Sequence, residues 1–168
     1  NTGNYSTPEP VSCTWTINKA DPDIRRLRWD YSQPFTYDGG EMKVELAGIP
    51  ETITAEYSGN TGTVVGHYTA HADLRPVNPE NYNAPSIADC DWEIVKAEYD
   101  MSDARWTGDM RFVYDGTEKS ISITGLPDGV EPVYSGNAAT EAGEYTASAE
   151  LTYDEHNYRQ PHIGTMDW

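Results

Sequence analysis

The feature of this sequence that most resembles a binding site is a run of basic residues beside a tryptophan. Arg25, Arg26 and Arg28 precede Trp29, and the pair Arg28-Trp29 occurs again as Arg105-Trp106. Arginine and tryptophan are favoured at binding hot spots, and an indole ring can also stack on a sugar. The alternative is structural, with each tryptophan packed at a sheet edge and covered by arginine stems. The candidate ligand-binding residues are therefore Trp29, Arg28, Trp106 and Arg105.

Catalytic chemistry has little support in the residue pattern. The sequence contains no Gly-x-Ser-x-Gly turn, no reactive cysteine–histidine signature and no glycine-rich loop that could cradle a phosphate. Carboxylates are numerous, so counting alone leaves open a pair of the kind that hydrolyses glycosides. The positions that stand out, however, are turns and core residues. We therefore predict a protein without enzymatic activity and without a cofactor.

Metal binding is also weakly supported. His67 and His71 are four residues apart. On a strand at ~3.3 Å per residue they would lie about 13 Å apart, which is too far to share one ion. Asp154-Glu155 and residues 21–23 (Asp-Pro-Asp) offer oxygen atoms for calcium, but neither has the spacing of a dedicated calcium loop. We predict no metal site, and a solvated acidic surface at both segments.

Most of these residues belong to a pattern that repeats along the chain. Residues 35–39 (Phe-Thr-Tyr-Asp-Gly) return 77 positions later as residues 112–116 (Phe-Val-Tyr-Asp-Gly). Near the end one residue is lost, so Asn157-Tyr158 and Trp168 follow their partners by 76 positions. Further matched segments are 48–50 with 125–127, 57–60 with 134–137, and 66–70 with 143–147. Internal repetition of this kind predicts a tandem array of similar units.

The boundary between units is placed at Lys-Ala, directly after the Trp-x-Ile segments at 15–17 and 92–94. Residues 1–18 then form the C-terminal strand of a preceding repeat, 19–95 the first repeat and 96–168 the second. A unit this short is marginal alone, so the neighbouring repeats of the same chain are its expected partners. We expect residues 1–18 to pack as an isolated strand against the first repeat, near Lys19.

Apolar and polar residues alternate through both repeats, which is typical of half-buried strands rather than helices. Tyr145, Ala147, Ala149 and Leu151 share one face of such a strand, and residues 68–74 repeat the pattern. Six or seven short strands per repeat predict an all-β fold of two tandem small immunoglobulin-like β-sandwich modules. The alternative is a pair of β-grasp-like α+β modules, whose single helix could only lie within residues 98–105.

Two pairs of equivalent residues could form covalent bonds. Cys13 and Cys90 each precede a tryptophan by two residues, which places them on one strand face and predicts buried free thiols. Because they hold equivalent places in successive units, they should lie farther apart than the ~6 Å between Cα atoms that a disulfide requires. Lys19 and Lys96 could form isopeptide bonds only if buried beside a carboxylate, and a solvent-facing or boundary role is simpler.

The chain also resembles a known family of repeats. The segments that carry the resemblance are Phe-Val-Tyr-Asp-Gly-Thr-Glu-Lys-Ser at 112–120, Ile-Thr-Gly-Leu-Pro-Asp-Gly-Val at 123–130 and Ala-Gly-Glu-Tyr-Thr-Ala at 142–147. They are similar to the MBG/YDG-type repeats of bacterial extracellular surface proteins, and residues 15–20 resemble the junction between such units. The resemblance implies a non-catalytic stalk or spacer in an adhesin-like protein. The alternative is an adhesive module that binds host or matrix glycans or proteins. The resemblance implies no catalytic residue and no particular ligand.

The charge of the chain narrows the possible partners. A net charge of -17 over 168 residues argues against nucleic acid, which requires a basic surface, and against anionic membranes. A helix that spans a bilayer needs a run of about 20 apolar residues, and the sequence contains none. No signal peptide is visible, and we expect the chain to be part of a longer precursor that is secreted or exposed on a bacterial cell surface.

Overall fold

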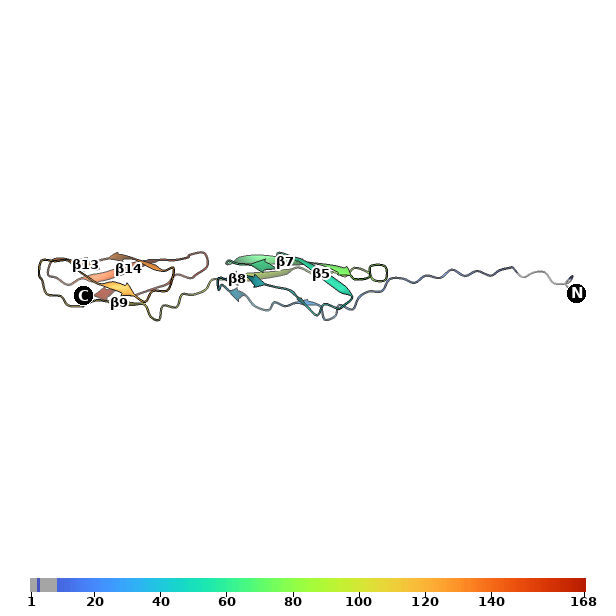
Figure 1. Ribbon diagram of the computed structural model, residues 1–168, viewed down its shortest axis with the longest axis horizontal. Coiled ribbons are helices and arrows are strands. Elements are labelled where there is room, and N and C mark those ends of the chain that lie inside the picture. The colour runs from blue at the N-terminus through green and yellow to red at the C-terminus, as the bar shows by residue number, and fades with distance from the viewer. Residues whose placement is uncertain (1–2, 4–8) are drawn as a thin grey trace.

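The computed structural model describes Gly3 and residues 9–168, and within this part the protein is all-β without a single helix. Its strands form two groups that follow one another along the long axis of the molecule (Figure 1). Strands β1 to β8, in the first repeat, pair only with one another, and so do β9 to β15 in the second. No helix in the described part is long and apolar enough to cross a membrane.

The first repeat is organised around a four-stranded sheet with the order β2-β8-β7-β5. Strand β2 runs parallel to β8, and the other two pairs are antiparallel. Two smaller ladders join β1 to β4 and β3 to β6. The strands are β1 (Arg28–Trp29), β2 (Phe35–Thr36), β3 (Met42–Lys43), β4 (Leu46–Ala47), β5 (Ile53–Ser58), β6 (Thr61–Gly62), β7 (Gly66–Pro76) and β8 (Cys90–Val95).

The second repeat follows the same plan with one strand fewer. A three-stranded sheet has the order β12-β14-β15, and two ladders join β9 to β11 and β10 to β13. These correspond to β5-β7-β8, β1-β4 and β3-β6 of the first repeat, whereas β2 has no counterpart. The strands are β9 (Arg105–Thr107), β10 (Lys119–Ser120), β11 (Ser122–Thr124), β12 (Glu131–Ser135), β13 (Ala138–Ala139), β14 (Thr146–Thr152) and β15 (Met166–Asp167).

Alternation along the long strands places one face of each against a core, as the sequence predicts. On β7, Ala70, Ala72 and Leu74 are buried, and the residues between them are exposed. The first repeat contains two buried clusters, and Trp29 packs against both of them. The second repeat contains one cluster, formed by Trp106, Ile121, Ile123 and Ala147. Each repeat therefore has a hydrophobic core of its own.

A recurring asparagine ties the turn before β6 or β13 to the residue that connects two neighbouring strands, Val44 between β3 and β4 or Ile121 between β10 and β11. The Asn60 side-chain amide donates to the Val44 carbonyl at 3.1 Å, and the Val44 backbone amide donates to the Asn60 carbonyl at 2.9 Å. Asn137 makes the same two hydrogen bonds with Ile121. Leaving a buried polar group unpaired costs about 1–3 kcal/mol, which explains why both repeats keep an amide side chain at this position.

The alternative with a helix in residues 98–105 is wrong. The Ser102 amide donates to the Asp100 carboxylate at 3.0 Å, which closes a tight turn in place of a helical one. The Ala104 amide donates to the Met101 carbonyl, and β9 begins at Arg105. The all-β prediction is therefore confirmed, whereas the immunoglobulin-like topology remains a prediction.

The expectation that residues 1–18 pack against the first repeat is wrong for residues 9–18, and the rest of that segment lies outside the described residues apart from Gly3. Val11, Trp15 and Ile17 are 99%, 78% and 81% exposed. The segment runs away from the first repeat as an extended chain that belongs to no strand (Figure 1). The physical reason is that β7 already has a partner on each side, β5 and β8, so the main sheet offers no place beside its longest strand.

Glycine is required where two segments of the backbone approach closely. Gly125 has a φ of +74°, and a Cβ at this position would collide with the carbonyl oxygen of Asp103. Gly48 has the same relation to Arg26 in the first repeat. Gly116 also has a positive φ, +78°, but a Cβ there would meet nothing within 4 Å. Substitution of Gly116 would therefore introduce backbone strain alone, whereas substitution of Gly125 would introduce both strain and a steric collision.

We predict that Gly125→Ala destabilises the second repeat much more than Gly116→Ala. The left-handed backbone alone costs about 1–2 kcal/mol in either variant. The collision with Asp103 adds roughly 1–3 kcal/mol in Gly125→Ala only. Thermal unfolding followed by near-ultraviolet circular dichroism measures both. Equal losses of stability in the two variants would show that the close approach at Gly125 does not exist.

Candidate functional site

The tryptophans of the predicted ligand site face the interior rather than solvent. Trp106 is 8% exposed, and its indole N–H donates to the Gly164 carbonyl at 2.8 Å. Trp29 is half-buried, and its indole N–H donates to the Ala88 carbonyl at 2.9 Å. A sugar could stack on the Trp106 ring only if that ring first left its core. Burial of the rings is what the structural alternative predicts for both tryptophans, in place of a ligand-binding role.

The arginines beside these tryptophans are exposed. Arg25 pairs with Asp23 at 2.7 Å, and this hydrogen-bonded guanidinium holds the pKa of Asp23 well below its usual range. Arg105 donates to the Asp103 carbonyl at 3.1 Å, and Arg28 lies exposed on β1. The basic cluster is thus displayed on the surface without the aromatic face that would accompany it. The ligand site at Arg28, Trp29, Arg105 and Trp106 remains a prediction.

The two cysteines lie in different environments. Both are free thiols. Cys90 is half-buried against the core of the first repeat, and burial raises the pKa of its thiol, which disfavours the reactive thiolate. Cys13 is exposed, so the prediction of a buried thiol is wrong there, because the extended segment that carries it packs on no sheet. Met166, which takes the place of Cys90 in the second repeat, packs against the second core.

The described residues hold no group of three or more side chains that could bind a metal ion. His67 lies 3.2 Å from the half-buried Glu93, and His71 lies 2.7 Å from the exposed Asp89. Lys96 is exposed and donates to the Glu155 carbonyl, while Lys19 is exposed as well. Neither lysine is buried beside a carboxylate, as an isopeptide bond would require.

The most extensively built site is the junction between the two repeats. Strand β8 ends at Val95, and Ala97, the second residue of the second repeat, already forms a parallel bridge to Tyr158 of the same repeat. The Ala97 amide donates to the Asn157 carbonyl at 3.0 Å, and the Arg159 amide donates to the Ala97 carbonyl at 2.8 Å. The connection therefore contains almost no free backbone between the sheet of one repeat and the first hydrogen bonds of the next.

Asn157 fastens the second repeat to a loop of the first. Its side-chain oxygen accepts a hydrogen bond from the Val65 amide at 3.0 Å, and its side-chain amide donates to Asp154 at 2.9 Å. The bond from Asn157 lowers the pKa of Asp154, with further help from the backbone amides of Asn157 and His156. Asn157 is 8% exposed. A buried amide with both ends satisfied fixes the relative position of the two segments that it joins.

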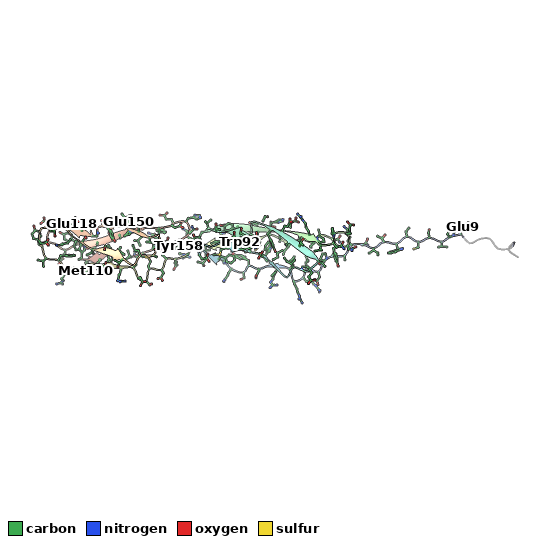
Figure 2. All side chains as sticks on the ribbon, in the orientation of Figure 1. Glu9, Trp92, Met110, Glu118, Glu150 and Tyr158 are labelled. Carbon is green, nitrogen blue, oxygen red and sulfur yellow. The ribbon has the colours of Figure 1, made fainter. Side chains whose placement is uncertain are left out.

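Tyrosine rings fill the rest of the junction. The Tyr158 ring stacks on Tyr99 with centroids 4.0 Å apart, and it meets Tyr37 of the first repeat edge-on at 5.4 Å. Figure 2 places Tyr158 where the two strand groups meet. Desolvation, with Tyr37, Tyr99 and Asp154 nearby, raises the pKa of Tyr158, so that the neutral phenol is favoured.

The two copies of the repeat show the effect of the junction on equivalent residues. Tyr37 is half-buried at the junction, whereas its counterpart Tyr114 is 62% exposed. Asn157 is buried, whereas its counterpart Asn81 is exposed. The sequence signals the recurrence of Asn-Tyr but does not say that these residues face a neighbour. The sequence does not indicate a structural role for Tyr99, because the residue does not recur and proline occupies the corresponding position of the first repeat.

No protein family, characterised protein or solved structure was found to match this chain.

We predict that Tyr37→Ala loosens the junction, while Tyr114→Ala leaves it unchanged. An aromatic pair contributes about 0.5–1.5 kcal/mol beyond its buried area, and only Tyr37 has a partner across the junction. NMR relaxation should show that the two repeats of Tyr37→Ala tumble more independently than those of the natural chain. Independent tumbling in the natural chain, or equal behaviour of the two variants, would contradict the role assigned to the tyrosine contact.

Proposed function

We propose that these repeats are non-catalytic spacers in the stalk of an extracellular protein, exposed on a bacterial cell surface or secreted. The observation that carries the proposal is the junction, where Asn157 and Tyr158 contact Val65 and Tyr37 of the first repeat. Ala97, two residues after the end of β8, is bonded to the same segment of the second repeat. A spacer must hold its ends at a fixed separation, and a short bonded connection achieves this where a flexible linker would not.

The surface charge supports the same function. The chain carries 28 acidic and 11 basic residues, so neighbouring copies repel one another sideways. Repulsion of this kind keeps crowded stalks soluble and separate. The resemblance to MBG/YDG-type repeats, carried by residues 112–120 and 123–130, points to the same setting.

We predict a fixed separation between equivalent points of the two repeats. Thr54 and Glu131 hold equivalent exposed positions on β5 and β12, and each can be replaced by a spin-labelled cysteine in a Cys13→Ser/Cys90→Ala background. Pulsed electron spin resonance should give one narrow distance distribution. Insertion of Gly-Ser-Gly between Lys96 and Ala97 should broaden it. A broad or multiple distribution in the uninserted chain would eliminate the spacer function.

Adhesion is the second candidate, and the exposed basic cluster at Arg25, Arg26 and Arg28 is the observation that favours it. Within an acidic chain such a cluster would select an anionic ligand, for instance a sialylated or sulfated glycan. Repetition along a stalk would then add avidity to weak individual contacts.

For adhesion we predict saturable binding to acidic glycans on a mucin and glycan array. The variant Arg26→Ser/Arg28→Ser should lose this binding at least ~10-fold, about 1.4 kcal/mol, since hydrogen bonds to charged groups contribute this much each. The variant Arg111→Ser/Arg159→Ser is the matched control, because it removes the same charge from exposed positions elsewhere. No binding by the natural chain, or equal loss in both variants, would remove this cluster as an adhesive site.

A further inference from the structure

The chain enters and leaves the first repeat at opposite ends of the long axis (Figure 1). It enters beside Ala20, whose backbone forms a parallel bridge to Tyr82. It leaves at Val95, where β8 runs parallel to β2. Residues 20–37 and residues 82–95 are therefore two segments that run in the same direction and are joined at both ends of the repeat.

Hydrogen bonds close the entry end of these two segments. The Ala20 amide donates to the Asn81 carbonyl at 2.8 Å, and the Asn83 amide donates to the Ala20 carbonyl at 2.9 Å. The Asn83 side-chain amide adds a bond to the Asp21 carboxylate at 2.7 Å. The first residues of the repeat are thus held by the segment that leads into β8, the last strand of the same repeat.

Further contacts join the same two segments between the entry and the exit. The Trp29 indole N–H donates to the Ala88 carbonyl at 2.9 Å, and the Glu93 amide donates to the Tyr31 hydroxyl at 3.2 Å. Beyond these contacts β2 pairs with β8. The connection between the two segments therefore extends from one end of the repeat to the other.

Tension along the chain loads all of these contacts together. It pulls Ala20 and Val95 in opposite directions, so that two parallel segments are forced to slide past one another. Their hydrogen bonds run from one segment to the other, across the direction of sliding, as the bond from the Tyr37 amide to the Val95 carbonyl does at 3.0 Å. Residues 38–81, which include β3 to β7, lie between the two joined segments and carry no load while these hold.

The second repeat has the same arrangement at its entry end. Ala97 forms the equivalent parallel bridge to Tyr158, and the Trp106 indole N–H donates to the Gly164 carbonyl at 2.8 Å, in the manner of Trp29. Tension that leaves the first repeat along β8 therefore reaches a contact of the same kind two residues after that strand ends.

We propose that the contact between residues 20–37 and 82–95 is a mechanical clamp, which lets the repeat bear tension along the chain without unfolding. The proposal rests on the spacer function, because a stalk that tethers another domain or surface to a cell is pulled through its two ends. Unfolding under force is governed by the unfolding barrier rather than by equilibrium stability. A small repeat with a modest free energy of unfolding can therefore resist tension if the pulled segments must slide rather than peel.

Single-molecule force spectroscopy on the whole chain tests the clamp, because the effect of a clamp depends on the direction of pulling. Handles are attached to pairs of exposed cysteines in the same background as for the spin labels. Asn18→Cys/Glu98→Cys loads the clamp by sliding, whereas Glu51→Cys/Val77→Cys peels β5 from β7. At equal loading rate the sliding direction should need a force higher by roughly twofold or more, because hydrogen bonds at both ends share the load while a peeled ladder opens one residue pair at a time. Equal forces in the two directions would overturn the proposal.

Two proline variants separate the clamp from general stability. Ala20→Pro removes the amide that donates to Asn81, so it should lower the force in the sliding direction and leave the peeling force unchanged. Ala55→Pro is the matched control, because Pro132 already occupies the equivalent position of β12, which pairs with β14 throughout. It should leave the sliding force unchanged, and circular dichroism checks that both variants fold. An unchanged sliding force in Ala20→Pro, or an equal loss in both variants, overturns the clamp.

Failure of the clamp can be told apart from failure of the spacer function. The spin-label distance between the two repeats tests the spacer function in the absence of any load. A narrow distance distribution together with equal forces in both pulling directions would leave the spacer function standing and overturn the clamp.

Discussion

The structure of this protein depends on the burial of Trp92 and Ile94 on strand β8. Both are 2% exposed, and the Trp92 ring stacks on Tyr68 at 4.5 Å and meets Phe35 edge-on at 5.9 Å. The indole N–H of Trp92 reaches the Gly59 carbonyl at 3.0 Å, so the ring also secures the turn before β6. Because β8 is the last strand of its repeat, the residue that completes one core lies next to the connection to the following repeat. The strand that completes the core of one repeat therefore also positions the repeat that follows it.

The second repeat shows how much of this arrangement a single tryptophan can maintain. Trp168 repeats the hydrogen bond of Trp92, donating to the Gly136 carbonyl at 3.0 Å, and its ring lies 5.3 Å from Tyr145 and 5.7 Å from Phe112. The core around Ile121 is accordingly closed, with that residue 1% exposed. The parallel pairing of β2 with β8 has no counterpart among the strands of the second repeat, where Phe112 takes the place of Phe35. Core packing and completion of the sheet are thus separable, and different residues of one strand are responsible for each.

The parts of this fold that the sequence predicts are those with a local period. Alternation identifies the inward face of β7 and β14, and recurrence identifies Asn60, Trp92 and the turn glycines as residues with a fixed structural task. Residues 98–105 look helical only because no alternation runs through them, and the turn at Asp100 depends on one side-chain hydrogen bond. Its likeness to Cys90 predicts burial of Cys13, but burial requires a sheet partner as well as the right sequence. The junction escaped prediction because Val65, Tyr99 and Tyr37 meet Tyr158 and Asn157 across unrelated sequence positions.

Different physical features govern contact along the axis and contact at the sides. Strand β12 pairs only with β14 among the described strands, and Pro132, its second residue, has no N–H to offer to another strand. The corresponding edge strand of the first repeat, β5, carries the exposed charge of Glu56, which lies 3.1 Å from Arg75. An approaching acidic copy therefore meets charge and an interrupted hydrogen-bonding edge. At the junction, by contrast, the contacts are between tyrosine rings, an asparagine side chain and backbone groups, none of which repel. The described contacts between repeats therefore lie along the axis, whereas the sides present charge and an edge that lacks one hydrogen-bond donor, a combination that would suit the spacer proposed above.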